Sequence, residues 1–357
     1  MIETETEVVV LNEQPEFCAC DGEKVSASYF VLCEEDDSSS QNLYDYKLAG
    51  MSLANWVVRV CETQPTILKV AKNHNVLDVI RPYISGSGYS VVLYANTPLV
   101  SKGHIADLLG FVSRRRMNVC KLKKGYVFKN DYIKNIDEIY SIDTYDFASN
   151  DFFEVKSFED LSYAQRVLFG KVMCYHKKNG VLFENEQTTT IEATADIGYA
   201  SFVSSGVSVL NHTSLGQNCK VGTNSVVSGS KIGEDVVIGK NVVIEDCVIN
   251  DGVVIENGAV LKNSVIGNNS KIGMCAKLVG AYIKNAGKIS DFVELSNARI
   301  CENVVVGKGS KIYGEKSNSV VLQNSIIGAN VVIIDSNIAE ASEIENNEII
   351  CTKRVGE

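Results

Sequence analysis

The sequence contains no run of 18 or more apolar residues, so it predicts no membrane-spanning helix. Its first residues, MIETETEV, are acidic and lack the basic and then apolar order of a secretory signal peptide. The apolar fraction of 45% and the mean hydropathy of +0.02 predict a soluble chain, and 357 residues suffice for two domains with sizeable cores. We therefore expect a cytoplasmic protein with no membrane partner.

The eleven cysteines include no CxxC pair and no Cys/His array with zinc spacing. Because their number is odd, the sequence favours free thiols in a reducing compartment and predicts no metal site. Cys18 and Cys20 form an isolated CxC, for which a metal or redox role is the less favoured alternative. Cys219 and Cys247 each stand two positions before an aliphatic residue of a repeat, which predicts small buried side chains.

The net charge of −10 is concentrated near the N-terminus. Residues 1–37 hold eleven acidic residues and a single basic one, whereas the rest of the chain has 33 of each sign. This balance argues against a nucleic-acid partner. One basic cluster, Arg114–Arg116 with Lys121, Lys123 and Lys124, could bind a phosphate or nucleotide, but a solvated helix end that balances the acidic segment is favoured.

Aliphatic residues recur every five or six positions from about Ile191 to Ile350. A longer, 17-residue period relates the members of the series Ile232, Ile249, Ile266, Ile283 and Ile300. One hexapeptide buries nothing alone, but stacked coils of three short faces place each aliphatic residue above its counterpart. Glycine, asparagine and aspartate near the aliphatic positions suit the corners between faces. The pattern predicts a parallel β-helix, with an ordinary β-sandwich as the disfavoured alternative.

The register of the repeat breaks once. After Ile312 the next aliphatic residue in phase is Val321, which places it four residues later than a regular coil would. We expect the segment Tyr313–Ser319 to contain a loop expelled from the prism.

A helix is expected before the coils, over about residues 157–179. Ser157 and Asp160 form a capping-box-like start, apolar residues follow at helical spacing, and Gly180 stands where a helix should stop. The preceding half has the features of a small α/β domain. Its expected strands are Val8–Leu11 and Ser90–Tyr94, its expected helices Leu53–Glu62 and Ile105–Arg116, and its expected polar loop Glu34–Gln41.

Four segments are similar to motifs of one enzyme family and follow in the same order. Leu43–Leu53 (LYDYKLAGMSL), Leu93–Leu99 (LYANTPL), Asp291–Glu294 (DFVE) and Gly309–Lys311 (GSK) match K-V-L-H-x-L-A-G-K-P-M, L-Y-G-D-x-P-L, N-F-V-E and G-S-K. The expected helix with its flanks, from Phe153–Val155 to Gly180–Val181, is similar to the linker helix of the same family. The chain thus resembles the bifunctional N-acetylglucosamine-1-phosphate uridyltransferase (UDP-N-acetylglucosamine pyrophosphorylase)/glucosamine-1-phosphate acetyltransferase family, in a shortened form.

The resemblance implies a fold and an assembly. It divides the chain into a reduced, Rossmann-like nucleotidyltransferase α/β domain (residues 1–156), a linker helix (157–180) and a β-helix of hexapeptide repeats (181–357). The left hand of the β-helix is likewise implied by the resemblance, because parallel crossovers are otherwise nearly always right-handed. A homotrimer with a nucleotide-sugar ligand is the assembly that the family implies.

The uridyl-transfer motifs are incomplete. Uridyl transfer needs a backbone cradle for the triphosphate and a cation held by a carboxylate. The family's L-A-A-G-x-G-T-R-M cradle follows its first strand, but here Val8–Leu11 precedes Asn12–Pro15, which has no glycine. The metal-binding aspartate of Y-G-D is replaced by Asn96, and the Q-x-x-x-L-G-T-G-H-A segment has no counterpart between Ile67 and Val92.

The acetyl-transfer motifs are also incomplete. The family places a histidine base a few residues after G-S-K, whereas Gly309–Lys311 is followed by no histidine. The N-Y-D motif is missing, and Lys277–Gly280 stands in the region of R-P-G. The coils contain one histidine, His212, for which an exposed corner position is favoured over a catalytic role.

These departures predict a divergent homologue with both active sites eroded, most readily a non-catalytic trimeric scaffold or regulatory protein. The alternative is an active hexapeptide-repeat acyltransferase or nucleotidyltransferase-related enzyme that acts on a nucleotide sugar between subunits, with acetyl-CoA or Mg as cofactor. A third hypothesis is a subunit of mixed trimers with the intact enzyme. His212 is the candidate catalytic residue, and Asn96, Lys47, Glu294 and Lys311 are the candidate substrate-binding residues.

Overall fold

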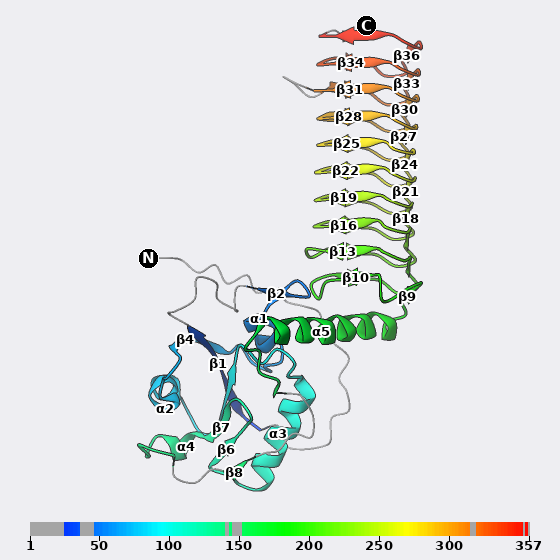
Figure 1. The fold of residues 1–357 in the computed structure, drawn as a ribbon. Coiled ribbons are helices and arrows are strands. Elements are labelled where there is room, and N and C mark those ends of the chain that lie inside the picture. The colour runs from blue at the N-terminus through cyan, green and yellow to red at the C-terminus, as the bar shows by residue number, and fades with distance from the viewer. Residues whose placement is uncertain are drawn as a thin grey trace. The chain divides into compact units, whose positions relative to one another are not determined.

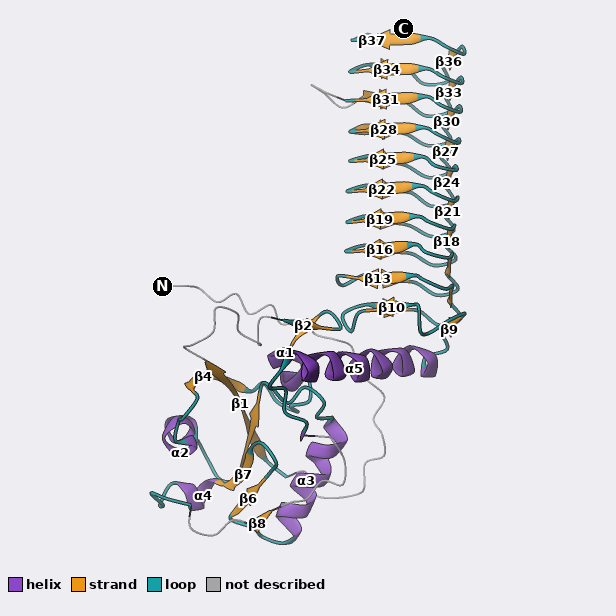
Figure 2. Ribbon diagram, in the orientation of Figure 1, coloured by secondary structure: helices purple, strands orange, loops and turns teal. Residues whose placement is uncertain are grey.

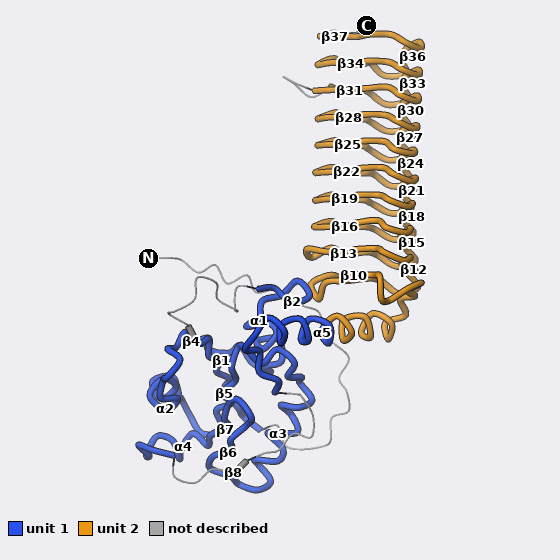
Figure 3. Tube along the Cα trace, in the orientation of Figure 1, with its two compact units in different colours: residues 1–168 blue, residues 169–357 orange. Residues whose placement is uncertain are grey.

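The computed structural model describes residues 25–35, 46–139, 143–144, 152–314, 319–352 and 354–355. The chain divides into two compact units, residues 1–168 and 169–357 (Figure 3). The expected strand Val8–Leu11 and the CxC of Cys18 and Cys20 lie outside the described residues, as does most of the expected loop after Glu35.

The described part of unit 1 is built on a six-stranded mixed sheet of order β4-β1-β5-β7-β6-β8 (Figure 1). The strands are β1 (Ala27–Glu35), β4 (Thr66–Ala71), β5 (Tyr89–Tyr94), β6 (Val119–Lys121), β7 (Tyr126–Lys129) and β8 (Asp143–Thr144). Strand β1 runs parallel to both β4 and β5, while β7 runs antiparallel to β5 and β6. A small hairpin of β2 (Lys47–Leu48) and β3 (Met51–Ser52) precedes the first helix.

Helices cover both faces of this sheet (Figure 2). They are α1 (Leu53–Val58), α2 (Val76–Ile80), α3 (Lys102–Arg114) and α4 (Asn130–Ile133), with a short 3-10 turn at Arg81–Tyr83. Val31 of β1 packs with α1 and α3, and its neighbour Leu32 packs on the opposite face with α2. Because both faces are buried, β1 and β5 are almost continuously apolar, as buried parallel strands are.

Two expectations for unit 1 need correction. The polar loop expected from Glu34 is wrong for Glu34 and Glu35, because their backbones pair with Val70 and Ala71 of β4 and so continue strand β1. The helix expected at Leu53–Glu62 ends at Val58, whereas the strand expected at Ser90–Tyr94 is confirmed as β5. The helix expected at Ile105–Arg116 is α3, which begins earlier because Ser101 accepts a hydrogen bond from the backbone of His104.

The long helix α5 spans Phe158–Lys178 and is capped at both ends. Ser157 Oγ accepts from the Asp160 backbone at 3.2 Å and the Asp160 carboxylate accepts from the Ser157 backbone at 3.0 Å, which confirms the capping box. At the other end Gly180 has a φ of 81°, and the backbone N–H groups of Gly180 and Val181 return to Lys177 and His176 in a Schellman motif. The boundary between the two compact units falls within α5, after Leu168, so a division at residues 156 and 180 stays a prediction.

Unit 2 is a left-handed parallel β-helix with three faces, each a ten-stranded parallel sheet within the described residues (Figure 1). The first face comprises β10 (Thr190–Ile191), β13 (Ser208–Leu210), β16 (Val226–Ser228), β19 (Val243–Glu245), β22 (Val260–Lys262), β25 (Lys277–Val279), β28 (Glu294–Ser296), β31 (Lys311–Tyr313), β34 (Val332–Ile334) and β37 (Ile349–Cys351). The second face comprises β11 (Asp196–Ile197), β14 (Ser214–Leu215), β17 (Lys231–Ile232), β20 (Val248–Ile249), β23 (Val265–Ile266), β26 (Tyr282–Ile283), β29 (Ala298–Ile300), β32 (Ser319–Val321), β35 (Asn337–Ile338) and β38 (Arg354–Val355). The third face comprises β9 (Leu182–Phe183), β12 (Phe202–Val203), β15 (Lys220–Val221), β18 (Val237–Ile238), β21 (Val254–Ile255), β24 (Lys271–Ile272), β27 (Lys288–Ile289), β30 (Val305–Val306), β33 (Ile326–Ile327) and β36 (Glu343–Ile344).

The 17-residue repeat is confirmed as the stacking register of the coils. Ile232 pairs with Ile249, and the same column continues through Ile266, Ile283 and Ile300, all of them buried. Every strand pair in the three faces of unit 2 is parallel, so each aliphatic side chain rests on the one below it.

The length of a coil depends on the corner between the first and second faces. In the 17-residue coils this corner holds one residue with positive φ, for example Asp246 or Asn263. In an earlier coil it holds two, Asn211 and His212, and that coil is one residue longer. Asparagine and aspartate tolerate this conformation better than other side chains, which explains the corner composition.

Buried hydroxyl groups tie successive coils together. Ser225 Oγ accepts from the buried Val242 backbone at 3.0 Å and donates to the Gly239 carbonyl at 2.8 Å. Cys219 and Cys247 occupy equivalent positions, and both are buried as predicted. Burial raises the pKa of both thiols, so they are space-filling groups of the corner rather than nucleophiles.

The break in register is confirmed between β31 and β32. Gly314 still donates to the Ser296 carbonyl of the previous coil, and the pairing resumes with Ser319 opposite Ala298. Residues 315–318, where the expelled loop is expected, lie outside the described residues.

The ladder of corner hydroxyls predicts the effect of one substitution. Ser225→Ala removes the acceptor of the buried Val242 N–H, so we expect it to lower the free energy of unfolding by about 1–3 kcal/mol. Urea unfolding followed by circular dichroism measures the change. Ser208→Ala, on the half-exposed outer side of β13, is the matched control and should change stability by less than about 0.5 kcal/mol. Equal effects of the two substitutions would contradict a stabilising role for the ladder.

Candidate functional site

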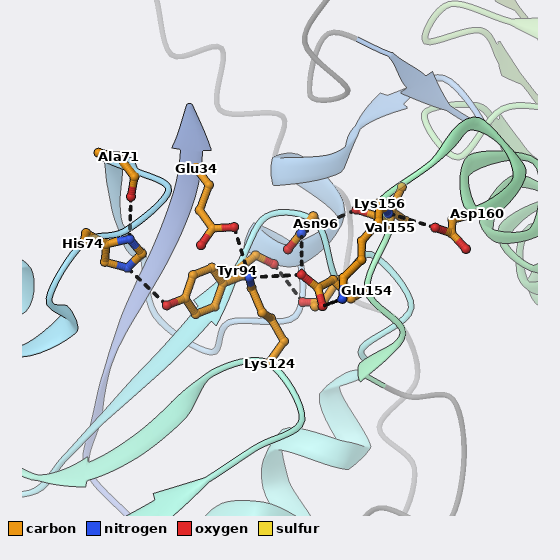
Figure 4. A network of polar contacts seen from close by, with 11 residues as sticks. Glu34, Ala71, His74, Tyr94, Asn96, Lys124, Glu154, Val155, Lys156 and Asp160 are labelled. Carbon is orange, nitrogen blue, oxygen red and sulfur yellow. Dashed lines mark hydrogen bonds and ion pairs between the residues drawn. The ribbon is translucent and has the colours of Figure 1, made fainter. Parts of the chain in front are cut away.

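Polar side chains gather where the three parallel strands of unit 1 end. Glu34 is near the end of β1, His74 follows β4, Tyr94 ends β5 and Asn96 follows it (Figure 4). With Lys124 and Glu154 these residues form the strand-end cluster. The connection after β1 leads to β4 and the connection after β5 leads to β6, on opposite sides of the β1–β5 pair. Open α/β sheets bind ligands at such a switch point.

Lys124 lies at the centre of the strand-end cluster. Its Nζ is 3.0 Å from Glu34 Oε2 and 3.0 Å from Glu154 Oε1, and it lies 4.5 Å from the centroid of the Tyr94 ring. Burial opposes its charged form, but the hydrogen bonds to Glu34 and Glu154 outweigh burial and raise the pKa of Lys124. One ammonium group therefore pairs with two carboxylates from distant parts of the chain and balances one of their two negative charges.

The turn between β6 and β7 brings Lys124 to this position. Leu122 donates to the Gly125 carbonyl at 3.0 Å, which closes the turn. Gly125 has a φ of 127°, and a Cβ atom there would lie 2.4 Å from the Val92 carbonyl oxygen of β5. A side chain at residue 125 would thus push the turn away from β5, so the glycine is required for this close approach.

Glu154 binds a second ammonium group. Its Oε2 lies 2.8 Å from Nζ of Lys156, whose side chain is 69% exposed. Burial favours the neutral acid, but the hydrogen bonds from Lys156 and Lys124 outweigh burial and lower the pKa of Glu154. The carboxylate is therefore ionised and fully paired at neutral pH.

Asn96 has a buried acceptor without a partner. The residue is 7% exposed, and its Nδ2 is 3.4 Å from Glu154 Oε1 and 3.5 Å from the Val155 carbonyl. Both neighbours are hydrogen-bond acceptors, so the carboxamide is oriented with its amide nitrogen toward them. Its Oδ1 is then left buried with no hydrogen bond.

His74 holds the outer edge of the cluster. Its Nδ1 is 2.7 Å from the Ala71 carbonyl, so this nitrogen carries the proton, and its Nε2 accepts from the Tyr94 hydroxyl at 3.2 Å. The pair fixes the Tyr94 ring against Lys124. The segments that resemble the family contain Tyr94 and Glu154 but gave no reason to select them, and His74 stands outside every such segment.

The strand-end cluster does not fit the divalent cation that the resemblance implies. Its two carboxylates are already paired with ammonium groups, and Asn96 offers a neutral oxygen where the family has an aspartate. In the described part of the chain, no group of three His, Cys, Asp or Glu side chains is arranged to hold a metal ion. The donor set therefore does not support metal-assisted nucleotidyl transfer.

Of the candidate residues, Glu294 and Lys311 of the coils are in contact, whereas Lys47 of unit 1 lies outside the strand-end cluster. Lys311 is in register with Glu294 on neighbouring coils, and its Nζ is 3.3 Å from Glu294 Oε1. Tyr313 donates to Glu294 Oε2 at 2.5 Å; burial and then Glu294 raise the pKa of this phenol to about 12. Lys47 is exposed on the β2–β3 hairpin, and among the described contacts none links it to the strand-end cluster.

His212 has the exposed corner position that the sequence favoured. Its backbone has a φ of 56° and its N–H donates to Thr194 Oγ1 at 3.3 Å.

The basic cluster divides in two: Arg114–Arg116 are exposed at the end of α3, whereas Lys124 points into the strand-end cluster.

None of the helices in the described part of the chain is both long and apolar enough to cross a membrane. Residues 203–286, within the coils, match the family model described as the GMPPB C-terminal domain. No curated protein matches the chain.

Among solved structures, the chain is similar to UDP-N-acetylglucosamine acyltransferase from Francisella novicida, with 14% identity and a TM-score of 0.33 over 47% of this chain and 62% of that one. The acetyltransferase domain of PglB from Neisseria gonorrhoeae is 19% identical, with a TM-score of 0.21. That match covers 53% of this chain and 62% of the PglB domain. GDP-perosamine N-acetyl transferase from Caulobacter crescentus is 9% identical, with a TM-score of 0.20. That match covers 91% of this chain and 93% of the transferase. The match spans 62% of each of the first two proteins.

Proposed function

We propose that this chain is a non-catalytic relative of the bifunctional sugar-nucleotide enzymes that it resembles, and that it acts as a trimeric scaffold or regulatory protein. The observation that carries the proposal is the charge state of the strand-end cluster. Both carboxylates there are neutralised by lysine ammonium groups, and Asn96 replaces the expected carboxylate.

Uridyl transfer is disfavoured by electrostatics. The reaction needs a divalent cation to offset the charge that develops on the triphosphate. A unit charge about 4 Å from Lys124 would meet a repulsion of about 4 kcal/mol in a partly buried setting, and a divalent ion about twice that. Glu34 and Glu154 would attract the same ion, but Lys124 and Lys156 balance their two negative charges, so no net attraction remains to offset the desolvation of the ion.

Acetyl transfer is disfavoured because no histidine follows Gly309–Lys311. Tyr313 stands near the position of the family's histidine, but its pKa of about 12 keeps the phenol protonated at neutral pH. Glu294 is held by Tyr313 and Lys311, and the hydrogen bond from Tyr313 is the main cause that lowers its pKa. A carboxylate with a lowered pKa is a weak base for an amine.

The match of residues 203–286 to a nucleotidyltransferase-related family supports the link to sugar-nucleotide enzymes. The trimer is proposed from the resemblance, and the short, flat faces of the coils support it as surfaces that could pack together.

The non-catalytic proposal predicts that the chain has neither uridyl-transfer nor acetyl-transfer activity. The full chain, mixed with UTP, N-acetylglucosamine 1-phosphate and Mg²⁺, should release no pyrophosphate above the buffer rate. With acetyl-CoA and glucosamine 1-phosphate it should release no free thiol. An intact bifunctional enzyme serves as the positive control. Turnover that disappears in Glu154→Gln, or in Glu294→Gln for acetyl transfer, would show that the proposal is wrong.

One observation favours a second candidate, acyl transfer at an inter-subunit site with His212 as the base. His212 is the additional residue of its corner, so the coil carries an exposed imidazole that its stacking does not require. Hexapeptide acyltransferases place a catalytic histidine on a coil that faces a neighbouring subunit, as the family resemblance implies.

The second candidate predicts a ligand-dependent shift in melting temperature. Acetyl-CoA at about 100 times its Kd should stabilise the native chain by about 2.7 kcal/mol. His212→Ala should abolish acyl transfer while leaving the melting temperature of the unliganded chain close to that of Asn218→Ala, a control at another exposed positive-φ corner. No shift with acetyl-CoA and no effect of His212→Ala would remove this candidate.

A further inference from the structure

We propose that Lys124 is a built-in cation, which occupies the place of a divalent metal ion between Glu34 and Glu154. Removal of its ammonium group would then convert the strand-end cluster into a divalent-cation site. The inference concerns the cluster alone and does not require the non-catalytic function proposed above.

The oxygen atoms around the ammonium group form the basis of the inference. Glu34 Oε2 and Glu154 Oε1 are each 3.0 Å from Lys124 Nζ, so they lie close to one point. Hard divalent cations bind carboxylate and amide oxygens at about 2.0–2.6 Å. Modest movement of the two side chains would bring their oxygens to that distance once Nζ is absent.

Asn96 supplies an independent indication of a third ligand. Its Oδ1 is buried and has no hydrogen-bond partner, and the residue as a whole is only 7% exposed. The carboxamide lies beside the Glu154 carboxylate (Figure 4), with its Nδ2 3.4 Å from Glu154 Oε1. Because Nδ2 rather than Oδ1 faces Glu154, the carboxamide would have to turn over to present Oδ1 to a cation, which would then satisfy this rare and costly unpaired acceptor.

The ammonium group also explains how three segments of unit 1 are held together. Glu34 belongs to β1, Lys124 to the β6–β7 turn and Glu154 to the segment before α5. Without a cation, the two largely buried carboxylates would repel each other. The cluster therefore requires one positive charge at its centre, and either a lysine or a metal ion can provide it.

The cluster is poorly suited to bind an anion in place of a metal. Lys124 is shared between two carboxylates, so it has no net positive charge to offer a phosphate. Lys156 is exposed, but its Nζ is paired with Glu154 at 2.8 Å.

The test is Mn²⁺ binding to the full chain, measured by the electron paramagnetic resonance signal of free Mn²⁺. Lys124→Ala should bind one Mn²⁺ per chain, with a Kd of about 10⁻⁴–10⁻³ M, typical of sites with few charged ligands. The native chain, Lys124→Arg and Lys121→Ala should bind none at the cluster. Lys124→Arg keeps the positive charge, and Lys121→Ala removes an exposed lysine of the neighbouring strand.

The ligands are tested by a double substitution. Lys124→Ala/Glu154→Gln should lose the Mn²⁺ binding gained by Lys124→Ala. Mn²⁺ should also raise the melting temperature of Lys124→Ala but not that of the native chain. If Lys124→Ala fails to fold, Lys124→Gln replaces it, because glutamine removes the charge but can still donate to the carboxylates.

Three results would overturn the proposal. One is a folded Lys124→Ala or Lys124→Gln chain that binds no Mn²⁺. Another is Mn²⁺ binding that survives Glu154→Gln. The third is a native chain whose own Mn²⁺ binding disappears in Glu34→Gln, because Lys124 would then not occupy the cation position.

Discussion

Each regular coil of the β-helix returns to its starting face in strict register with the coil before it, and the rest of unit 2 depends on this return. A short coil has no core of its own, so its aliphatic side chains are buried only when they rest on those of the next coil. Ile249 lies between Ile232 and Ile266 because the backbone bonds of the parallel strands fix that register. A shift by one residue would turn the column outward, which is why the period is so strict. The corner between the first and second faces adjusts the length of a coil: a single positive-φ residue gives the regular repeat, and the pair of Asn211 and His212 lengthens it by one.

The same register determines which polar residues meet on the outer surface. Residues one repeat apart lie on neighbouring coils, so Glu294 faces Lys311 without any motif that requires it. An ion pair on a β-helix is therefore an expected result of the repeat, and exposed pairs contribute little stability. The hydrogen bond from Tyr313 to Glu294 is different, because Tyr313 stands directly before the break in the repeat. It holds the end of β31 to the previous coil at the point where the regular spacing is lost.

The sequence predicted unit 2 better than unit 1 because the two units encode their folds differently. In a repeat the spacing of residues determines which of them are in contact, so the column of Ile232 and the burial of Cys219 could be predicted from position alone. In unit 1 the neighbours of a strand are distant in sequence, so nothing near Glu34 indicates that its backbone pairs with Val70. The candidate Asn96 was found from a motif and lies in the cluster, whereas His74 was missed because only the order of the strands brings it to Tyr94.

Charge balance connects Asn96 to the charged residues of the strand-end cluster, Lys124, Glu34 and Glu154. An aspartate at residue 96 would add a third negative charge beside Glu34 and Glu154, and the two ammonium groups of Lys124 and Lys156 could not neutralise all three. With asparagine there, Lys124 and Lys156 balance the two carboxylates, and no excess charge remains for a cation to offset. Asn96 and Lys124 are thus consistent parts of one electrostatic arrangement. Asparagine at residue 96 adds no negative charge, and the ammonium group of Lys124 supplies the positive charge that Glu34 and Glu154 require at the centre of the cluster.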